Sequence, residues 1–131
     1  MNINNNKNIC IRWKPKSITP HEQLLQIKKD QNITGKSCYA GRLDPMARGW
    51  MIYLLNEETK NMEKFMGLSK TYEFYIVLGI STDSMDCMGI IENKDFLYGE
   101  KEVNDILIQI KKGSFTEYKQ LMPKFSAYKA K

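Results

Sequence analysis

Histidine, arginine and paired cysteines are scarce in this sequence of 131 residues. Its one histidine, His21, has no cysteine nearby, and Cys10, Cys38 and Cys87 lie far apart without C-x-x-C spacing. Zinc sites and disulfide frameworks need close, regular sets of these residues, and isolated cysteines are typical of reduced cytosolic proteins. The sequence also has no glycine-rich phosphate-binding loop and no Ser-His-Asp set. We therefore expect no metal site and no cofactor.

Long hydrophobic runs are also missing. The opening MNINNNKNIC has no apolar core of signal-peptide length, and no later run approaches the length that spans a bilayer. We expect a cytoplasmic protein without a membrane segment. Residues 1–8 are predicted to form a flexible arm, and residues 9–131 a single domain, since this length is typical of one domain.

The charge balance is basic, with 20 Lys+Arg against 15 Asp+Glu, a net charge of +5 and a pI near 9.0. This favours a polyanionic partner such as RNA or DNA, although a surface solvated by lysines would give the same excess. Only three of the cations are arginines, and two of them, Arg42 and Arg48, flank Asp44 in the stretch GRLDPMARG.

Local patterns predict a mixture of strands and helices. Thr19, Pro20 and Glu22 form a capping box with proline at the first helical position. We expect strands at 9–13, 50–55, 70–80 and 90–92, helices at 20–29, 57–66 (capped by Asn56) and 103–110 (ended by Gly113), a long loop at 30–49, and a last strand near 125–129. Trp50 and Tyr53 are expected in the core. The order indicates an α+β fold with a mixed, largely antiparallel sheet flanked by helices.

Asp44 is followed by Pro45, and Asp-Pro commonly opens a turn. A structural turn is the simplest interpretation. Because proline holds the preceding residue extended, the turn would also project the carboxylate, as a catalytic acid or nucleophile requires. Arg42 and Arg48 could keep it ionised or grip phosphates. The acidic stretch 82–89 has the wrong spacing for an EF-hand calcium loop. Tyr72 begins an alternating strand, where a core or a base-stacking role is open.

Five stretches together resemble the TruB family of tRNA pseudouridine synthases. They occur in the family's order: KPKSITPH (14–21), GRLDPMARG (41–49), LLNEETK (54–60), SKTYEFYIVLGISTDSMDCMG (69–89) and MPKFSAYK (122–129). The resemblance implies the pseudouridine synthase catalytic-domain fold, a tRNA T-arm as partner, and isomerisation of the T-loop uridine at position 55 to pseudouridine without a cofactor.

The resemblance also implies roles for particular residues. Asp44 corresponds to the catalytic aspartate, and Tyr72 to the tyrosine that stacks on the target base. Tyr39 stands where bacterial members carry a histidine that opens the T-loop. Arg42 and Arg48 are candidate contacts to the substrate.

The family pattern continues beyond Lys131, so the resemblance implies a catalytic domain incomplete at its C-terminus. The family's further strands and an arginine that pairs with the aspartate would then be missing, and Arg42 or Arg48 could substitute. Two alternatives to an active enzyme stay open: an RNA-binding remnant without turnover, and a fragment without a role of its own.

Overall fold

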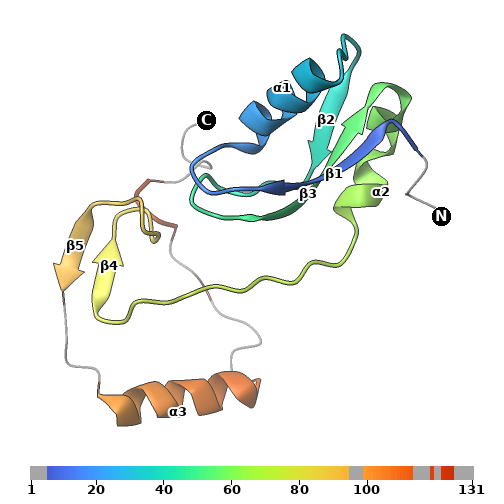
Figure 1. The fold of residues 1–131 in the computed structure, drawn as a ribbon. Coiled ribbons are helices and arrows are strands. Elements are labelled where there is room, and N and C mark those ends of the chain that lie inside the picture. Colours follow the sequence, from blue (N-terminus) through green and yellow to red (C-terminus); the bar gives the residue numbers. More distant parts are fainter. Residues whose placement is uncertain (1–5, 95–98, 114–118, 120–121, 126–131) are drawn as a thin grey trace. The chain divides into compact units, whose positions relative to one another are not determined.

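The structure is a computed structural model that describes residues 6–94, 99–113, 119 and 122–125. The chain divides into two compact units after Tyr72, and each is described by itself. Both contain helices and antiparallel strands, so the predicted α+β class is confirmed (Figure 1).

The first unit is built on a three-stranded antiparallel sheet. Strands β1 (Ile9–Lys14), β2 (Ser37–Ala40) and β3 (Gly49–Leu55) lie in the order β1-β3-β2. In the register, Trp13 lies opposite Trp50. The predictions of β1 and β3 are confirmed. The predicted loop at 30–49 is wrong in its middle, because four residues of it pair with β3.

Helix α1 (Pro20–Asp30) begins as its sequence predicts. The Thr19 hydroxyl accepts a hydrogen bond from the Glu22 N–H (3.1 Å), and the Glu22 carboxylate accepts one from the Thr19 N–H (2.6 Å). The helix packs on one face of the sheet and encloses the first core cluster: Leu24, Ile27, Met51, Tyr53 and Leu55.

The predicted helix at 57–66 is instead a 3-10 helix, η2 (Asn56–Asn61), followed by the short α2 (Met62–Met66). Asn56 does not cap it. Its backbone is left-handed (φ 50°), and its side-chain amide donates to the Asn8 Oδ1 (3.0 Å).

A second core cluster lies on the sheet face opposite α1 and consists of Ala40, Leu54 and Phe65. The two helices thus flank the sheet (Figure 1). Trp50 points to this second face but is 70% exposed, so its predicted place in the core is wrong; it makes an edge contact with Trp13, with ring centroids 5.6 Å apart.

Asn6 lies in the predicted arm, and its side-chain amide donates to the Glu58 Oε1 (2.7 Å). The arm as a whole stays a prediction, because residues 1–5 lie outside the described residues.

In the second unit the predicted strand at 70–80 is largely wrong. Residues 69–77 form no strand, and only β4 (Ile80–Thr82) pairs, with β5 (Ile91–Lys94). Alternating apolar residues specify a strand only when another strand supplies hydrogen bonds, and the described residues supply none to this stretch. Its side chains on both faces, including Tyr72 and Phe74, are exposed.

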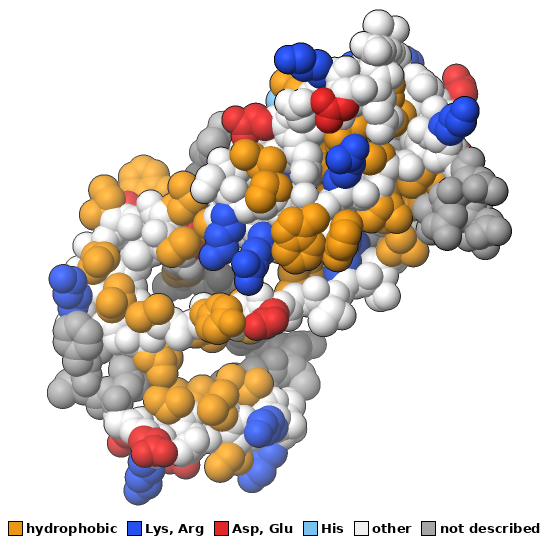
Figure 2. All heavy atoms as spheres, in the orientation of Figure 1, with side chains coloured by type: hydrophobic (Ala, Val, Ile, Leu, Met, Phe, Trp, Pro, Cys, Tyr) orange, Lys and Arg blue, Asp and Glu red, His pale blue; other side chains and the backbone are white. Residues whose placement is uncertain are grey.

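Helix α3 (Glu100–Lys111) contains the predicted helix at 103–110, and Gly113 follows it with the left-handed φ of 69° that ends helices. None of its residues is buried. Hydrophobic side chains lie at the surface over α3 and the β4–β5 hairpin (Figure 2). The last predicted strand falls, apart from Phe125, outside the described residues.

Candidate active site

Asp44 opens the β-turn that its sequence predicts. The Ala47 N–H donates to the Asp44 carbonyl oxygen (3.0 Å), and Pro45 takes the second turn position, where its fixed φ fits. The Asp44 side chain is exposed. Within the described part of the chain its carboxylate accepts no hydrogen bond and joins no ion pair. The turn therefore presents an unoccupied carboxylate to solvent.

Contacts on both sides hold the loop that carries this turn. The Ser17 N–H donates to the Pro45 carbonyl oxygen (2.8 Å). Leu43 packs against the first core cluster, and a Cβ on Gly49 would lie only 3.2 Å from the Leu43 Cδ1. Gly41 has φ 93°, a conformation that glycine adopts without strain. The Asp44 loop is thus fixed at its turn and its ends.

Lys14 lies beneath this loop and is the one charged side chain that the described residues bury, with 0% exposure. Its Nζ donates to the carbonyl oxygens of Pro15 (2.9 Å) and Ile18 (2.8 Å). Burial lowers the pKa of the ammonium, and the nearby Asp44 carboxylate opposes that shift by raising it.

Arg42 and Arg48 are both exposed. Each was expected either to pair with Asp44 or to bind phosphate. No ion pair links them to Asp44 in the described residues. Their guanidinium groups are accordingly available to an anionic ligand.

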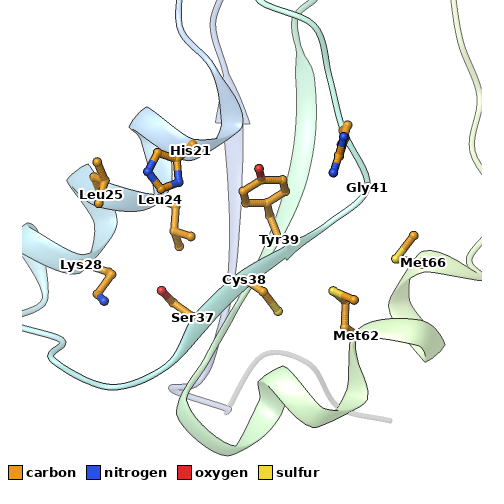
Figure 3. A pocket seen from close by; sticks show the side chains of 11 residues that line it. His21, Leu24, Leu25, Lys28, Ser37, Cys38, Tyr39, Gly41, Met62 and Met66 are labelled. Atoms are coloured by element: carbon orange, nitrogen blue, oxygen red, sulfur yellow. The ribbon is translucent and has the colours of Figure 1, made fainter. Parts of the chain in front are cut away.

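Beside the start of the Asp44 loop is a cavity of about 480 Å³. Figure 3 shows Tyr39 between the side chains of α1, which include His21, and Met62 and Met66 of α2. Arg42 also lines the cavity, whereas Asp44 and Arg48 do not.

Tyr39 lies on β2 and is half-buried. Its ring meets that of Tyr53 edge-on, with centroids 6.3 Å apart. Tyr53 is fully buried, its hydroxyl donates to the Gln23 Oε1 (2.5 Å), and burial raises its pKa to about 12. The Tyr39 ring is therefore held by a rigid neighbour, five residues before Asp44.

Tyr72 closes the first unit and is 64% exposed. Lys70 precedes it, with its Nζ bonded to the carbonyl oxygens of Met66 (2.6 Å) and Leu68 (2.8 Å). A Cβ on Gly41 would lie 3.8 Å from the Lys70 Cε, so Lys70 is beside the start of the Asp44 loop. In the described residues Tyr72 itself makes no ring contact or hydrogen bond with that loop.

The acidic stretch 82–89 uses its carboxylates within its own loop. Asp83 Oδ1 accepts from the Ile90 N–H, and Asp86 Oδ1 accepts from the Met88 N–H, both at 2.8 Å. The described residues contain no His, Cys, Asp or Glu cluster suited to a metal ion. The geometry gives this stretch a structural role.

Sequence reasoning placed Lys14 in a motif but did not predict its burial. The signal was the Lys-Pro pair at the end of a strand. A lysine there is usually solvated, and only the contact between residue 17 and residue 45 shows what covers it.

Three relatives illustrate what this chain is similar to. The tRNA pseudouridine synthase B of Aquifex aeolicus (strain VF5) is 33% identical over 119 residues, which are 90% of this chain and 40% of that protein. The protein of the same name from Mesoplasma florum is 34% identical over 127 residues (95% and 43%). That from Acholeplasma laidlawii is 37% identical over 117 residues (88% and 40%). The chain thus spans about two fifths of the length of these curated relatives.

No helix among the described residues has the length and apolar character needed to cross a bilayer. The family described as TruB family pseudouridylate synthase (N terminal domain) matches residues 26–131, which include the Asp44 loop, Tyr72 and the second unit. By this match the chain belongs to the TruB pseudouridylate synthase family, as the resemblance of its motifs predicts.

Proposed function

We propose that this chain acts in tRNA modification as a pseudouridine synthase in the cytoplasm, with the T-loop uridine at position 55 as its target. The observation that carries the proposal is the Asp44 carboxylate, which is exposed and unbonded on a turn held from both sides. A carboxylate that only stabilised the fold would be expected to accept hydrogen bonds or pair with a cation. Family membership supplies the kind of reaction.

The proposed chemistry needs a charged carboxylate at the target nucleoside. Conversion of uridine to pseudouridine breaks the N1–C1′ bond and, after the base has turned, forms a C5–C1′ bond. The C5 proton leaves to solvent and N1 gains a proton, so the product is an isomer. Asp44 would act on the ribose or the pyrimidine ring as the nucleophile. The fixed turn would orient it for attack.

The base must leave its stack to reach Asp44, at a cost of a few kcal/mol. Stacking on an aromatic side chain contributes about 1–3 kcal/mol per base. We assign this role to Tyr72, whose ring is exposed. Tyr39 would contact the opened T-loop from the cavity that it lines. Arg42 and Arg48 would bind phosphates.

The test is tritium release from tRNA labelled at uridine C5. It is run with the chain and with the chain fused to the part of the Aquifex aeolicus relative that it does not match. Asp44→Asn should reduce release at least about 100-fold with little loss of tRNA affinity, since the carboxylate acts in the chemistry. Asp30→Asn, at the far end of α1, is the matched control and should retain activity. An Asp44→Asn variant with more than a few per cent of the activity contradicts the proposal.

The alternative is an RNA-binding protein without turnover, which the exposed Arg42 and Arg48 would also support. Both readings require tRNA affinity that falls steeply with salt and a T-arm stem-loop that competes with whole tRNA. If such binding is found but neither wild-type protein releases tritium, the alternative holds.

A further inference from the structure

The Asp44 carboxylate has a cation close by, and it is not one of the arginines that the sequence offers. Arg42 and Arg48 form no ion pair with it in the described residues. The electrostatic partner that the structure gives it is Lys14, which reaches the loop from the end of β1.

The backbone places Lys14 at the foot of the Asp44 loop. It pairs in register with Gly49, the residue at which that loop re-enters the sheet. Its two hydrogen bonds, to the carbonyls of Pro15 and Ile18, close the turn between β1 and α1. Ser17 in the same turn donates to the Pro45 carbonyl. A continuous set of contacts therefore runs from the ammonium to the proline next to Asp44.

An ammonium has three N–H donors. Two of them meet carbonyls, and in the described residues the third has no hydrogen-bond acceptor. A buried cation that lacks a full set of partners is stabilised by a nearby anion, and the same attraction stabilises the anion. We propose that Lys14 is a positioning residue for Asp44: its buried charge holds the turn that supports the loop and keeps the carboxylate ionised. This inference rests on the proposed role of Asp44.

The other charges near this turn belong to exposed side chains and are screened by solvent. Lys16 lies in the turn itself, and His21 and Glu22 lie at the start of α1, where Glu22 is bound to Thr19. Arg42 and Arg48 flank Asp44 on its loop. Lys14 differs from all of these because water does not reach it.

The coupling is measured on Lys14 itself, by NMR titration of its side chain in the full chain. Asp44→Asn removes the anion that raises the pKa of Lys14, so that pKa should fall, by about half a unit for a partly screened pair. Asp30→Asn removes a carboxylate elsewhere on the same unit and should leave Lys14 unchanged. Because Asp44 is exposed, its substitution is not expected to disturb the fold. An unchanged Lys14 titration in Asp44→Asn overturns the proposal.

Substitution of Lys14 separates its charge from its bulk. Lys14→Met should increase amide hydrogen exchange at Ser17 and move the acid limb of tritium release to higher pH, whereas Lys14→Arg should keep both close to wild type. A Lys14→Met variant whose acid limb does not move would contradict the charge effect, and the Asp44→Asn titration decides the matter if Lys14→Met does not fold. If Lys14 responds to Asp44→Asn but that variant keeps its activity, the catalytic assignment fails and the coupling stands.

Discussion

The first unit buries two clusters of hydrophobic side chains, one on each face of its sheet, whereas none of the described residues from 73 to 125 is buried. Both units nevertheless contain regular elements. In the second, α3 forms twelve residues of helix although the apolar side chains along it, such as Leu107 and Ile110, are 47% and 54% exposed.

The difference separates what makes an element from what makes it stable. Local signals such as a helix start and an ending glycine are sufficient to specify α3. Most of the free energy that stabilises a helix in a protein comes from packing of its apolar face. We therefore expect cooperative unfolding from the first unit and opening of the second at lower free energy.

The largest effect should come from matched leucine truncations. Leu54→Ala removes a fully buried side chain in the first unit and should cost about 2–5 kcal/mol of unfolding free energy. Leu107→Ala in α3 should leave the same transition nearly unchanged. Urea unfolding followed by tryptophan fluorescence measures both, since Trp13 and Trp50 lie in the first unit. Equal losses in the two variants would contradict the comparison.

The same distinction explains which elements the sequence predicts. Helix α1 carries its own start signal in Thr19 and Glu22, and β1 and β3 are dense in apolar residues, so local patterns suffice. Strand β2 is short, and it is a strand because β3 pairs with it, which no local pattern encodes. The alternation at 70–80 has the reverse fate, since the pattern is present and the partner is not among the described residues.

For the candidate site, Asp-Pro predicts the Asp44 turn because proline restricts the backbone of both residues. The cavity next to Tyr39 could not be predicted, since α1, β2 and α2 meet there only after folding. The burial of Lys14 depends on the same long-range contacts. Local chemistry therefore predicts the shape of the loop, and tertiary packing decides which charges surround it.

Tyr53 gives the first unit a pH dependence that the second lacks a counterpart for among its described residues. Burial raises the pKa of Tyr53 to about 12, above its value of about 10 in an unfolded chain. The folded state then holds the proton more tightly, so this stability is present below pH 10 and is lost as the pH rises from 10 to 12. The loss should be about 1–2 kcal/mol by the usual value per pKa unit.

Tyr53→Phe is the variant that isolates this effect. It removes the titrating hydroxyl and its bond to Gln23, so it should be less stable at pH 8 but decline less steeply above pH 10. The urea midpoint at several alkaline pH values is the measurement. Parallel declines in wild type and variant would assign the pH dependence to other groups.

Helix starts provide a smaller test. Thr19→Ala removes the cap of a helix that packs on the core, and should lower the stability of the tryptophan transition by about 1 kcal/mol. Glu102→Ala removes the carboxylate that accepts from the Gly99 N–H at the start of α3. Circular dichroism should detect some loss of helix in this variant while the tryptophan transition stays in place. A shift of that transition would mean that α3 stabilises the first unit.

The smallest effect is expected where the two units share one feature. Ser17 in the first unit and Met85 in the second both have left-handed backbones, with φ of 71° and 60°. Glycine relieves this strain but loses more entropy on folding, so the net gain should be about 0.5 kcal/mol. Ser17→Gly should raise the urea midpoint of the tryptophan transition, because the strained residue lies in the turn that supports Pro45. Met85→Gly relieves similar strain where no described residue is buried, and should not move that midpoint. If both substitutions raise it, the two units unfold together, and the contrast in burial does not divide their stability.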